Sequence, residues 1–574
     1  MKDNNPTLRP SEEMRWKQFY ASGYEEILHK GFPQKTLWEF VESGIAEDGN
    51  QHDALVYFGR RISRQELVEQ VNLWARVLKG MGLSEGDEIL LFGPTFPEFI
   101  YILLAANKIG LTANLPNLMI KPEALESAVG QSRVAFVYDG MEKDIRKVLE
   151  RPQFEHVVIL SATHSMGYPL KLIASPLNRL KYPCHRPKYL RADNAIRRFG
   201  KYEGPLEKRA DTGKPAYIFC SSGTTGKGNA NQIPMSDKAM LAMCRNAVAF
   251  NLKGNPFRPG KSYCPLPPFV CTGFFVLVIA PLHRGMTVYL DPRMSARQFA
   301  KNMLTFRPQI SLATGAYWVH FIRQVDGLLQ KGKRPDLSFL RFPVMGGEGC
   351  TPAALKHINE VLEACGSPVA LTSGYGLSET FSVCTVDYEP TGFDKDYSRA
   401  AVSVGYPFPG TTVGVFDENG KELGYGERGE IRVKTEALMT DGWLHTRDYG
   451  EMDCNGKLFV YGRMNQYVMA PGGEKVYLFD IANRLREDPA VKDALVCQLD
   501  TEESPLVAHV VLEDNLKETE KEILARLDAG MKAFLPKGLS IKGYRWEQEE
   551  LKINLVGKID RNYYSHVLTG YHSL

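Results

Sequence analysis

The chain has 574 residues, of which 44% are hydrophobic and 24% charged, and its formal net charge is only +3. This length exceeds what one hydrophobic core usually organises, so the chain is expected to form two or more domains of a soluble globular protein. A net charge this small for the length gives no reason to expect attraction to nucleic acid.

The chain carries no sign of export or membrane insertion. Its ten cysteines include no CxxC pair, which is typical of a reducing compartment and argues against a zinc site or a disulfide framework. The first residues are polar and contain no apolar signal core. The longest apolar run, Val270 to Leu282, is interrupted by Thr, Gly and Pro and is too short to span a bilayer. We therefore expect a cytoplasmic protein without an integral membrane segment.

The N-terminal part alternates predicted strands with predicted helices. Short apolar runs indicate strands, and apolar residues at helical spacing indicate helices. The strands are expected at residues 54–58, 88–92, 134–138 and 157–160, and the helices at 64–81 and 98–109. Such alternation favours a largely parallel α/β architecture.

Residues 176–214 break this alternation, because they contain several prolines and many Lys and Arg side chains. We interpret them as a solvated connector. A nucleic-acid patch is the less favoured alternative, since the few aromatic residues show no regular spacing.

After this connector, a strand is predicted at residues 216–220 and a helix at 238–251, with its start signal at Ser236-Asp237. Further strands and helices follow to about Val460. Residues 465–574 have the size and pattern of a separate small α+β unit.

The stretch FCSSGTTGKGNANQIP, residues 219–234, lies between this strand and helix. Its hydroxyls and glycine N–H groups could donate to phosphate oxygens, and strand-to-helix junctions favour anion sites. A Walker-type loop is excluded, because Lys227 is followed by Gly228 and Ser221 stands where the first glycine belongs. The dinucleotide fingerprint has a different glycine spacing. Spacing alone therefore favours a flexible surface loop.

Other segments change this interpretation. Residues 221–226 resemble the phosphate loop of the adenylate-forming superfamily, which includes acyl-CoA synthetases, adenylation domains of peptide synthetases and luciferases. Further motifs of that family are matched in its order by GYGLSET at 374–380, GWLHTRD at 442–448, YGR at 461–463 and GKIDR at 557–561. Weaker similarity reaches back to about Thr36, so the resemblance covers most of the chain.

The resemblance implies an α/β fold with two parts. A large N-terminal multi-subdomain α/β domain, residues 1–464, would bind ATP and the acyl substrate. A small mobile α+β C-terminal domain, residues 465–574, would carry the adenylation lysine.

The resemblance also implies the reaction. The protein would use ATP to convert a carboxylic acid to an acyl-adenylate, releasing pyrophosphate, and would then transfer the acyl group to a thiol, most commonly that of coenzyme A. ATP, Mg²⁺ and coenzyme A are the implied cofactors. An acyl carrier protein or an amine stays open as the acceptor. A non-catalytic relative that only binds a nucleotide or acyl ligand also stays open.

Two residues are implied as catalytic. Lys558 would bridge the attacking carboxylate and the α-phosphate, and Glu379 would hold Mg²⁺, a hard cation that prefers oxygen ligands. Tyr375 would stack on adenine, and Asp448 would accept hydrogen bonds from the ribose. Outside its motif, each could be an ordinary solvated charge or core aromatic. The implied nucleotide-binding residues are Ser221, Ser222, Gly223, Thr224, Thr225, Gly226, Lys227, Gly347, Glu348, Tyr375, Gly376, Ser378, Asp448 and Arg463.

The chain departs from the family pattern in several places. The phosphate loop lacks Pro-Lys-Gly, and Lys227 would supply the missing charge from two positions earlier. Arg447 stands in place of a glycine. Asn465 is the implied hinge, where the family has Asp or Lys. Gly472 and Gly473 resemble the strand that lines the pantetheine tunnel, where small residues permit close approach.

The expected acyl pocket is apolar. Its segment PLPPFVCTG lacks the Asp that pairs with the substrate amine in peptide-synthetase domains, and an unpaired buried ammonium would be costly. An apolar acyl or aryl carboxylate is therefore favoured, and GGEK at 472–475 hints at an aryl acid. The pocket residues are expected to be Phe269, Val270, Cys271, Thr272, Gly346 and Gly347.

Overall fold

The computed structural model describes residues 9–573, except for residues 21, 31–33, 48–51, 185, 207–210, 221–231, 251–256, 382, 388–392, 394–396 and 515. The predicted phosphate-loop residues Ser221 to Lys227 therefore lie outside the described residues.

A seven-stranded sheet forms the N-terminal part of the fold, with strand order β7-β6-β5-β3-β4-β8-β9. All neighbouring pairs are parallel except β8 with β9. The central strands are apolar on both faces, as expected when helices cover both faces of a parallel sheet. The strands are β3 (Glu88–Phe92), β4 (Thr112–Leu115), β5 (Val134–Tyr138), β6 (His156–Leu160), β7 (Tyr189–Arg191), β8 (Pro215–Cys220) and β9 (Gln232–Ser236).

A 13-stranded sheet has the order β17-β18-β19-β20-β16-β15-β14-β13-β12-β10-β11-β1-β2. Neighbours from β1 to β14 pair in parallel, whereas those from β14 to β17 pair antiparallel. The strands are β1 (Asp53–Tyr57), β2 (Arg60–Ser63), β10 (Lys261–Cys264), β11 (Thr287–Leu290), β12 (Ile310–Ala313), β13 (Phe342–Met345), β14 (Thr372–Gly376), β15 (Val383–Asp387), β16 (Ser403–Pro407), β17 (Thr411–Phe416), β18 (Arg428–Thr435), β19 (Leu444–Met452) and β20 (Leu458–Arg463).

Helices join the two sheets into one hydrophobic core. Helix α4 packs on α5 and α9, and α3 packs on α5 and α12. Every residue of α5 from Pro97 to Asn107 is buried, as expected of a helix that is apolar all round. No described helix is long and apolar enough to cross a membrane. The helices are α3 (Leu37–Glu47), α4 (Arg64–Gly80), α5 (Pro97–Lys108), α6 (Pro122–Ala128), α7 (Glu142–Leu149), α8 (Leu170–Lys181), α9 (Ala192–Phe199), α10 (Asp237–Ala249), α11 (Cys271–Phe274), η2 (Phe275–Ile279), α12 (Ala280–His283), α13 (Ala296–Phe306), α14 (Gly315–Leu329) and α15 (Pro352–Ala364).

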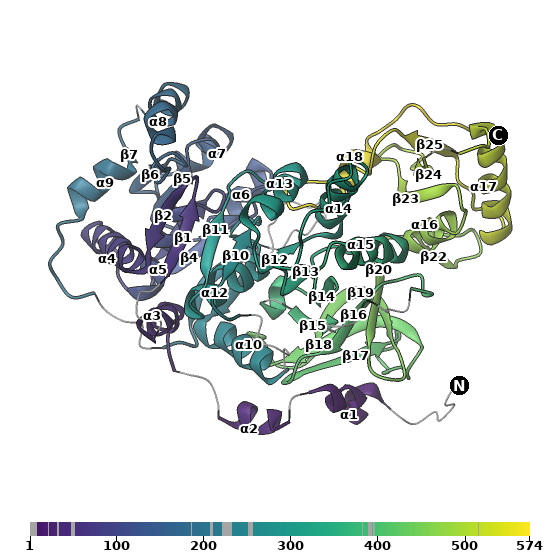
Figure 1. Cartoon of the computed structure of the whole chain (residues 1–574), viewed down its shortest axis with the longest axis horizontal. Coiled ribbons are helices and arrows are strands. Elements are labelled where there is room, and N and C mark those ends of the chain that lie inside the picture. Colours follow the sequence, from purple (N-terminus) through teal and green to yellow (C-terminus); the bar gives the residue numbers. More distant parts are fainter. Residues whose placement is uncertain are drawn as a thin grey trace.

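The C-terminal region has its own small sheet, β23-β24-β25, and a hairpin of β21 and β22. Apolar residues between 468 and 546 form a core cluster there. Figure 1 shows this region to the right of the large sheets. The mixed α/β prediction, with large N-terminal sheets and a small C-terminal sheet, is confirmed, while the domain boundary at residue 465 stays a prediction. The elements are β21 (Tyr467–Met469), β22 (Lys475–Tyr477), α16 (Leu478–Arg486), β23 (Val491–Gln498), β24 (Leu506–Leu512), α17 (Glu520–Phe534), β25 (Gly543–Glu547) and α18 (Arg561–Ser565).

The prediction of a solvated connector at residues 176–214 is wrong. The segment contains the end of α8, strand β7, which pairs in parallel with β6, and helix α9, which packs on α4. Pro176 lies inside α8 on its exposed side, so water can bond the backbone carbonyl that the proline leaves unpaired. The many basic residues made the segment resemble a linker, although Tyr189, Ala192 and Ala195 are buried.

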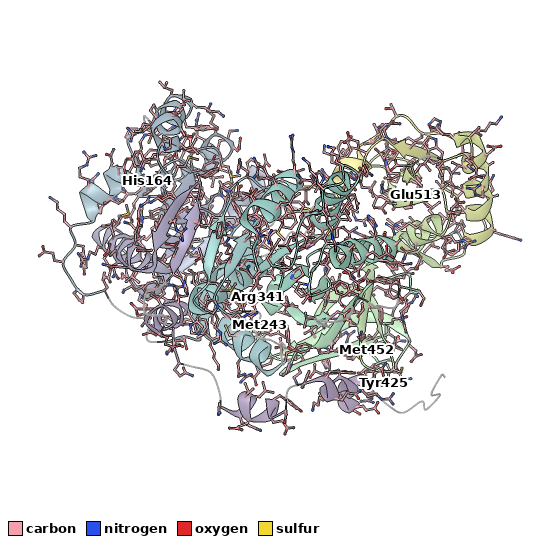
Figure 2. All side chains as sticks on the ribbon, viewed as in Figure 1. His164, Met243, Arg341, Tyr425, Met452 and Glu513 are labelled. Atoms are coloured by element: carbon pink, nitrogen blue, oxygen red, sulfur yellow. The ribbon has the colours of Figure 1, made fainter. Side chains whose placement is uncertain are left out.

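The first described residues form a strap of three short helices, of which α1 (Pro10–Glu13) and η1 (Arg15–Phe19) lie along the antiparallel part of the large sheet and α2 (Tyr24–His29) packs on α10. Trp16 is fully buried, and Ser11 donates two hydrogen bonds to the Glu422 carboxylate, at 2.9 and 2.6 Å. Arg15 lies over the ring of Tyr425 at 4.7 Å. Figure 2 shows Tyr425 beside the α1 segment.

The burial of Trp16 predicts that the strap stabilises the antiparallel region. We expect Trp16→Ala to lower its stability by about 3–5 kcal/mol, because a large buried ring is removed and leaves a cavity. The thermal unfolding midpoint would measure this loss. Leu568→Ala is the control, because Leu568 is 59% exposed and its loss should have little effect. Equal midpoints for the two variants would show that the strap contributes nothing.

Candidate active site

Three side chains meet where the large sheet changes from parallel to antiparallel pairing. Tyr375 lies near the end of β14, Asp448 in β19 and Arg463 at the end of β20. The Tyr375 hydroxyl donates to Asp448 Oδ2 at 2.7 Å, and Arg463 Nε lies 3.1 Å from Asp448 Oδ1. A carboxylate has about four lone-pair sites, so Asp448 keeps the capacity to accept further hydroxyl donors.

Burial raises the pKa of Asp448, and the positive charges of Arg463 and Lys558 oppose that rise. The register explains the pairing, since Asp448 and Arg463 are partners across β19 and β20. Asp448 itself is 7% exposed, so its carboxylate is largely shielded from water. The arrangement presents an oriented, buried acceptor at the edge of the sheet.

Arg447 holds β19 in an unusual conformation. Its φ of 59° lies in the left-handed region, which glycine adopts most easily and where other residues pay about 1–2 kcal/mol. Hydrogen bonds support the neighbouring backbone: Asp448 N donates to Thr446 Oγ1 at 3.0 Å, and Arg463 Nη1 donates to Thr446 O at 3.0 Å. The chain therefore keeps the turn that a glycine would make at this position.

Lys558 is carried by a loop that is tied to the large region on both sides of the lysine. Thr314 Oγ1 donates to the carbonyl of Gly557 at 2.8 Å, and Ile559 N donates to Glu348 Oε2 at 2.6 Å. Within the loop, Asn554 Oδ1 accepts from the backbone N–H of Lys558 at 3.1 Å. These bonds fix the backbone from which Lys558 projects.

The charges around Lys558 come from both parts of the chain. Burial lowers its pKa, Glu348 and Asp448 counteract that effect, and Arg463 adds to it. Burial raises the pKa of Glu348, against the pull of Arg561 and Lys558. A Cβ added to Gly347 would lie 3.8 Å from Lys558 Cε, so the lysine stem passes close to this glycine.

The expected acyl-pocket segment lies beside the GYGLSET motif. The Cys271 thiol is within hydrogen-bonding reach of the hydroxyls of Ser378 and Thr272, and burial raises its pKa to about 11. The Cys271 thiol is therefore uncharged at neutral pH, as suits a residue lining the expected acyl pocket. Phe269 is buried, whereas Val270 and Thr272 are half-buried, and Glu379 is half-buried in η3 (Ser378–Thr380).

The start of the predicted phosphate loop is close to this place, although the loop itself lies outside the described residues. Strand β8 ends at Cys220, and the ring of Phe219 lies 6.3 Å from that of Phe381, just after η3. Phe381 is fully buried and also contacts Phe275, with ring centroids 5.0 Å apart.

Other predicted residues lie away from this cluster or at its rim. Gly346 is half-buried, and Gly376 is exposed. Asn465 is exposed in the turn between β20 and β21. Gly472 and Gly473 are exposed in the turn between β21 and β22, where an added Cβ would meet nothing within 4 Å.

Sequence reasoning missed Thr314 and Arg561 as site residues. Thr314 follows β12 directly, at the carboxyl end of a parallel strand, where open α/β sheets gather binding residues. Its position after a strand could have identified Thr314 as a candidate binding residue. Arg561 ends the GKIDR motif, but its effect on the charge of Glu348 follows only from the folded loop.

Fold and site together define an adenylate-forming enzyme. A model of the AMP-binding enzyme family matches residues 43–442, which is more than half of the chain. The chain therefore belongs to the AMP-binding enzyme family, and the predicted membership of the adenylate-forming superfamily is confirmed.

Relatives differ in the acceptor that their names give. A long-chain-fatty-acid–CoA ligase of Salmonella typhimurium is 22% identical over 80% of this chain and 82% of its own length. A fatty acid–[acyl-carrier-protein] ligase of Streptomyces coeruleorubidus is 24% identical over 77% and 80%. The structure of an amide bond synthetase from Marinactinospora thermotolerans superposes with a TM-score of 0.70 at 19% identity, covering 92% of this chain and 99% of the other.

The contacts of Gly557 yield a test of the lysine loop. Its φ is +79°, and a Cβ there would lie 2.4 Å from Thr314 Oγ1. Gly557→Ala should displace the loop and slow adenylate formation by about 10²-fold, the typical cost of misplacing a reacting group by an ångström. Acid-dependent pyrophosphate release would measure this rate.

Gly332→Ala is the matched control. Gly332 also has a positive φ, +69°, but an added Cβ meets nothing within 4 Å. Its backbone strain is similar, and its rate should stay near wild type. If both variants slow the reaction equally, strain alone explains the loss, and the Thr314–Gly557 contact does not position the loop.

Proposed function

We propose that this enzyme joins a carboxylic acid to the thiol of coenzyme A in two half-reactions. In the first, a carboxylate oxygen attacks the α-phosphorus of ATP, the bond to pyrophosphate breaks, and an acyl-adenylate forms. In the second, the sulfur of coenzyme A attacks the acyl carbonyl carbon, the thiol gives up its proton and AMP leaves. The carrying observation is that the backbone on both sides of Lys558 is bonded to Thr314 and Glu348 of the large region, where the lysine charge interacts with Glu348, Asp448 and Arg463.

Lys558 is proposed as the cation of the first half-reaction. The attacking carboxylate and the α-phosphate both carry negative charge, and an ammonium between them lowers the barrier most where charge crowds in the transition state. The hydrogen bonds from Thr314 and to Glu348 position its backbone before substrate arrives. Preorganisation of this kind avoids reorganising the site during the reaction.

Tyr375 and Asp448 are proposed to hold the nucleoside. The hydrogen bond between them orients the Tyr375 ring, whose face is suited to adenine, and Asp448 accepts from the ribose hydroxyls. The positive charge of Arg463 opposes the rise that burial causes in the pKa of Asp448. The backbone at Gly347, Gly376 and Ser378 would border the nucleotide, and residues 221–227 would enclose the outer phosphates.

Glu379 is proposed to bind Mg²⁺ together with phosphate oxygens. The described residues contain no group of three or more metal-ligating side chains, which fits a cation that takes most of its ligands from substrate and water. Mg²⁺ would neutralise phosphate charge as pyrophosphate leaves. Glu379 is half-buried, so its carboxylate is open to such a ligand.

The second half-reaction requires Lys558 to withdraw and the thiol to approach. We propose that Asn465, exposed in the turn after β20, is the hinge, and that Gly472 and Gly473 then line the path of the pantetheine arm. Release of the lysine loop would break the hydrogen bonds of Gly557 and Ile559 to the large region and withdraw Val556 from its core. Hinge motions of small domains use a few such turn residues.

The acid is proposed to be apolar, an acyl or aryl carboxylate, because Phe269, Val270 and Cys271 present no charged group that could pair with a substrate amine. An acyl carrier protein or an amine is the alternative acceptor, favoured by the names of two of the relatives. A panel of carboxylates assayed for pyrophosphate release, with coenzyme A or an amine supplied in turn, separates these cases. We expect the enzyme to work in the cytoplasm.

Lys558→Ala tests the proposed first half-reaction. We expect acid-dependent pyrophosphate release to fall about 10²–10³-fold, because the lost charge acts mainly in the transition state. ATP affinity should change little, since Tyr375 and Asp448 remain. Thioester formation from a supplied acyl-adenylate should also persist. A wild type that binds ATP but releases no pyrophosphate with any acid would favour a binding-only protein.

The lowered pKa of Lys558 predicts an alkaline limit. Its ammonium loses its proton at a pH below the ordinary lysine pKa of 10.5, so kcat/KM for pyrophosphate release should fall on the alkaline side as the charge is lost. In Lys558→Arg the cation persists to higher pH, so the slower variant should show its alkaline limb shifted upward. An unshifted limb would assign the titration to another group.

A further inference from the structure

Helix α8 carries an apolar stripe that faces solvent. Leu170, Ile173, Leu177 and Leu180 recur at helical spacing and are 43%, 65%, 62% and 81% exposed. No residue of the helix is buried. Six of the thirteen exposed large hydrophobic side chains among the described residues lie between residues 168 and 180. Single exposed apolar residues need no explanation, but a gathered stripe indicates a contact surface.

The helix is attached to the protein by its polar side. Asn178 Nδ2 donates to Ser161 Oγ at 2.9 Å and also to the Asp139 carboxylate. Ser175 Oγ donates to Thr163 Oγ1 at 3.3 Å. An amphipathic helix of a globular protein normally buries its apolar stripe, so α8 has the reverse orientation. Figure 1 shows α8 protruding at the edge of the seven-stranded sheet region.

The chain segment that carries this stripe is rich in basic residues. Residues 161–192 contain six Lys or Arg residues and no Asp or Glu. Among the described residues, neither Lys171 nor Lys181 has an ion-pair partner, and Lys181 lies over the ring of Tyr182 at 5.1 Å. Arg179 pairs with Asp193 at 3.6 Å, with both side chains well exposed, and such a pair is easily exchanged for another anion.

We propose that α8 docks this protein on the surface of an anionic lipid bilayer. The helix lies in the plane of the interface, with the stripe of Leu170, Ile173, Leu177 and Leu180 in the acyl boundary. The ammonium group of Lys181, which lies next to the stripe on the helix, reaches the phosphate level, because long basic side chains keep their heads in the polar layer. Twelve residues are too few to span the bilayer, so the helix rests on it.

The combination of features favours a bilayer over a protein partner. The stripe is on a protruding helix, and a flat bilayer can receive such a convex surface without a matching groove. The segment of residues 161–192 around it is basic, and the unpaired charge of Lys181 next to the stripe complements anionic headgroups. A second copy of the chain would bring the same positive charges together and repel. The proposal does not depend on which acid or acceptor the enzyme uses.

The test uses the full chain and sedimented vesicles. Wild type should bind vesicles of phosphatidylcholine mixed with phosphatidylglycerol, bind phosphatidylcholine alone weakly, and be released by salt. The triple variant Ile173→Ser, Leu177→Ser, Leu180→Ser should bind the anionic vesicles at least about tenfold more weakly, because the inserted apolar area is lost. Lys181→Gln should weaken binding and reduce its dependence on salt.

Leu568→Ser is the matched control, since Leu568 is 59% exposed and lies in the C-terminal region. It should bind vesicles like wild type. All variants should keep the wild-type unfolding midpoint and ATP affinity, because the replaced side chains are exposed.

Two results would overturn the proposal. One is a wild type that ignores anionic vesicles, or a triple variant that binds them unchanged. The other is a wild-type dimer in solution that the triple variant converts to monomer while vesicle binding is absent, which would make the stripe a contact between copies.

Discussion

The position of the Lys558 ammonium is the constraint on which the site depends. A lysine favours full hydration, and burial here lowers its pKa. Glu348 and Asp448 offset that cost by their negative charge, and Glu348 also accepts from the backbone of the lysine loop. Glu348 therefore stabilises the Lys558 charge and also holds the lysine loop by a hydrogen bond. The same carboxylate joins two parts of the chain more than two hundred residues apart.

The change from parallel to antiparallel pairing at β14 brings two groups of site residues together. The parallel strands bring Thr314, Gly347 and Glu348 to their carboxyl ends, as open α/β sheets do with binding residues. The antiparallel strands β19 and β20 then present Asp448 and Arg463 opposite each other. Tyr375 sits at the junction and bonds Asp448. Parallel pairing alone would not place these two groups of side chains together.

Much of the fold was predictable because its signals are local. Strands β3 and β5 end at the predicted residues, and α4 ends one residue early. The segment at 176–214 was not predictable, since its helix exposes apolar residues and its basic side chains resemble those of a linker. In the site, Tyr375, Asp448 and Lys558 were found through their motifs, whereas Thr314 joins only through a tertiary contact. The phosphate-loop prediction stays untested.

Helix α8 and the lysine loop both depart from the usual distribution of polar and apolar side chains, in opposite directions. The loop buries a charge that reaction requires, whereas α8 leaves apolar side chains in water although polar contacts hold it in place. Both arrangements lower the stability of the folded protein, and departures of this kind are often found at functional sites. Because α8 and the C-terminal region lie on different sides of the large sheets, docking by α8 would leave the lysine loop free to move (Figure 1).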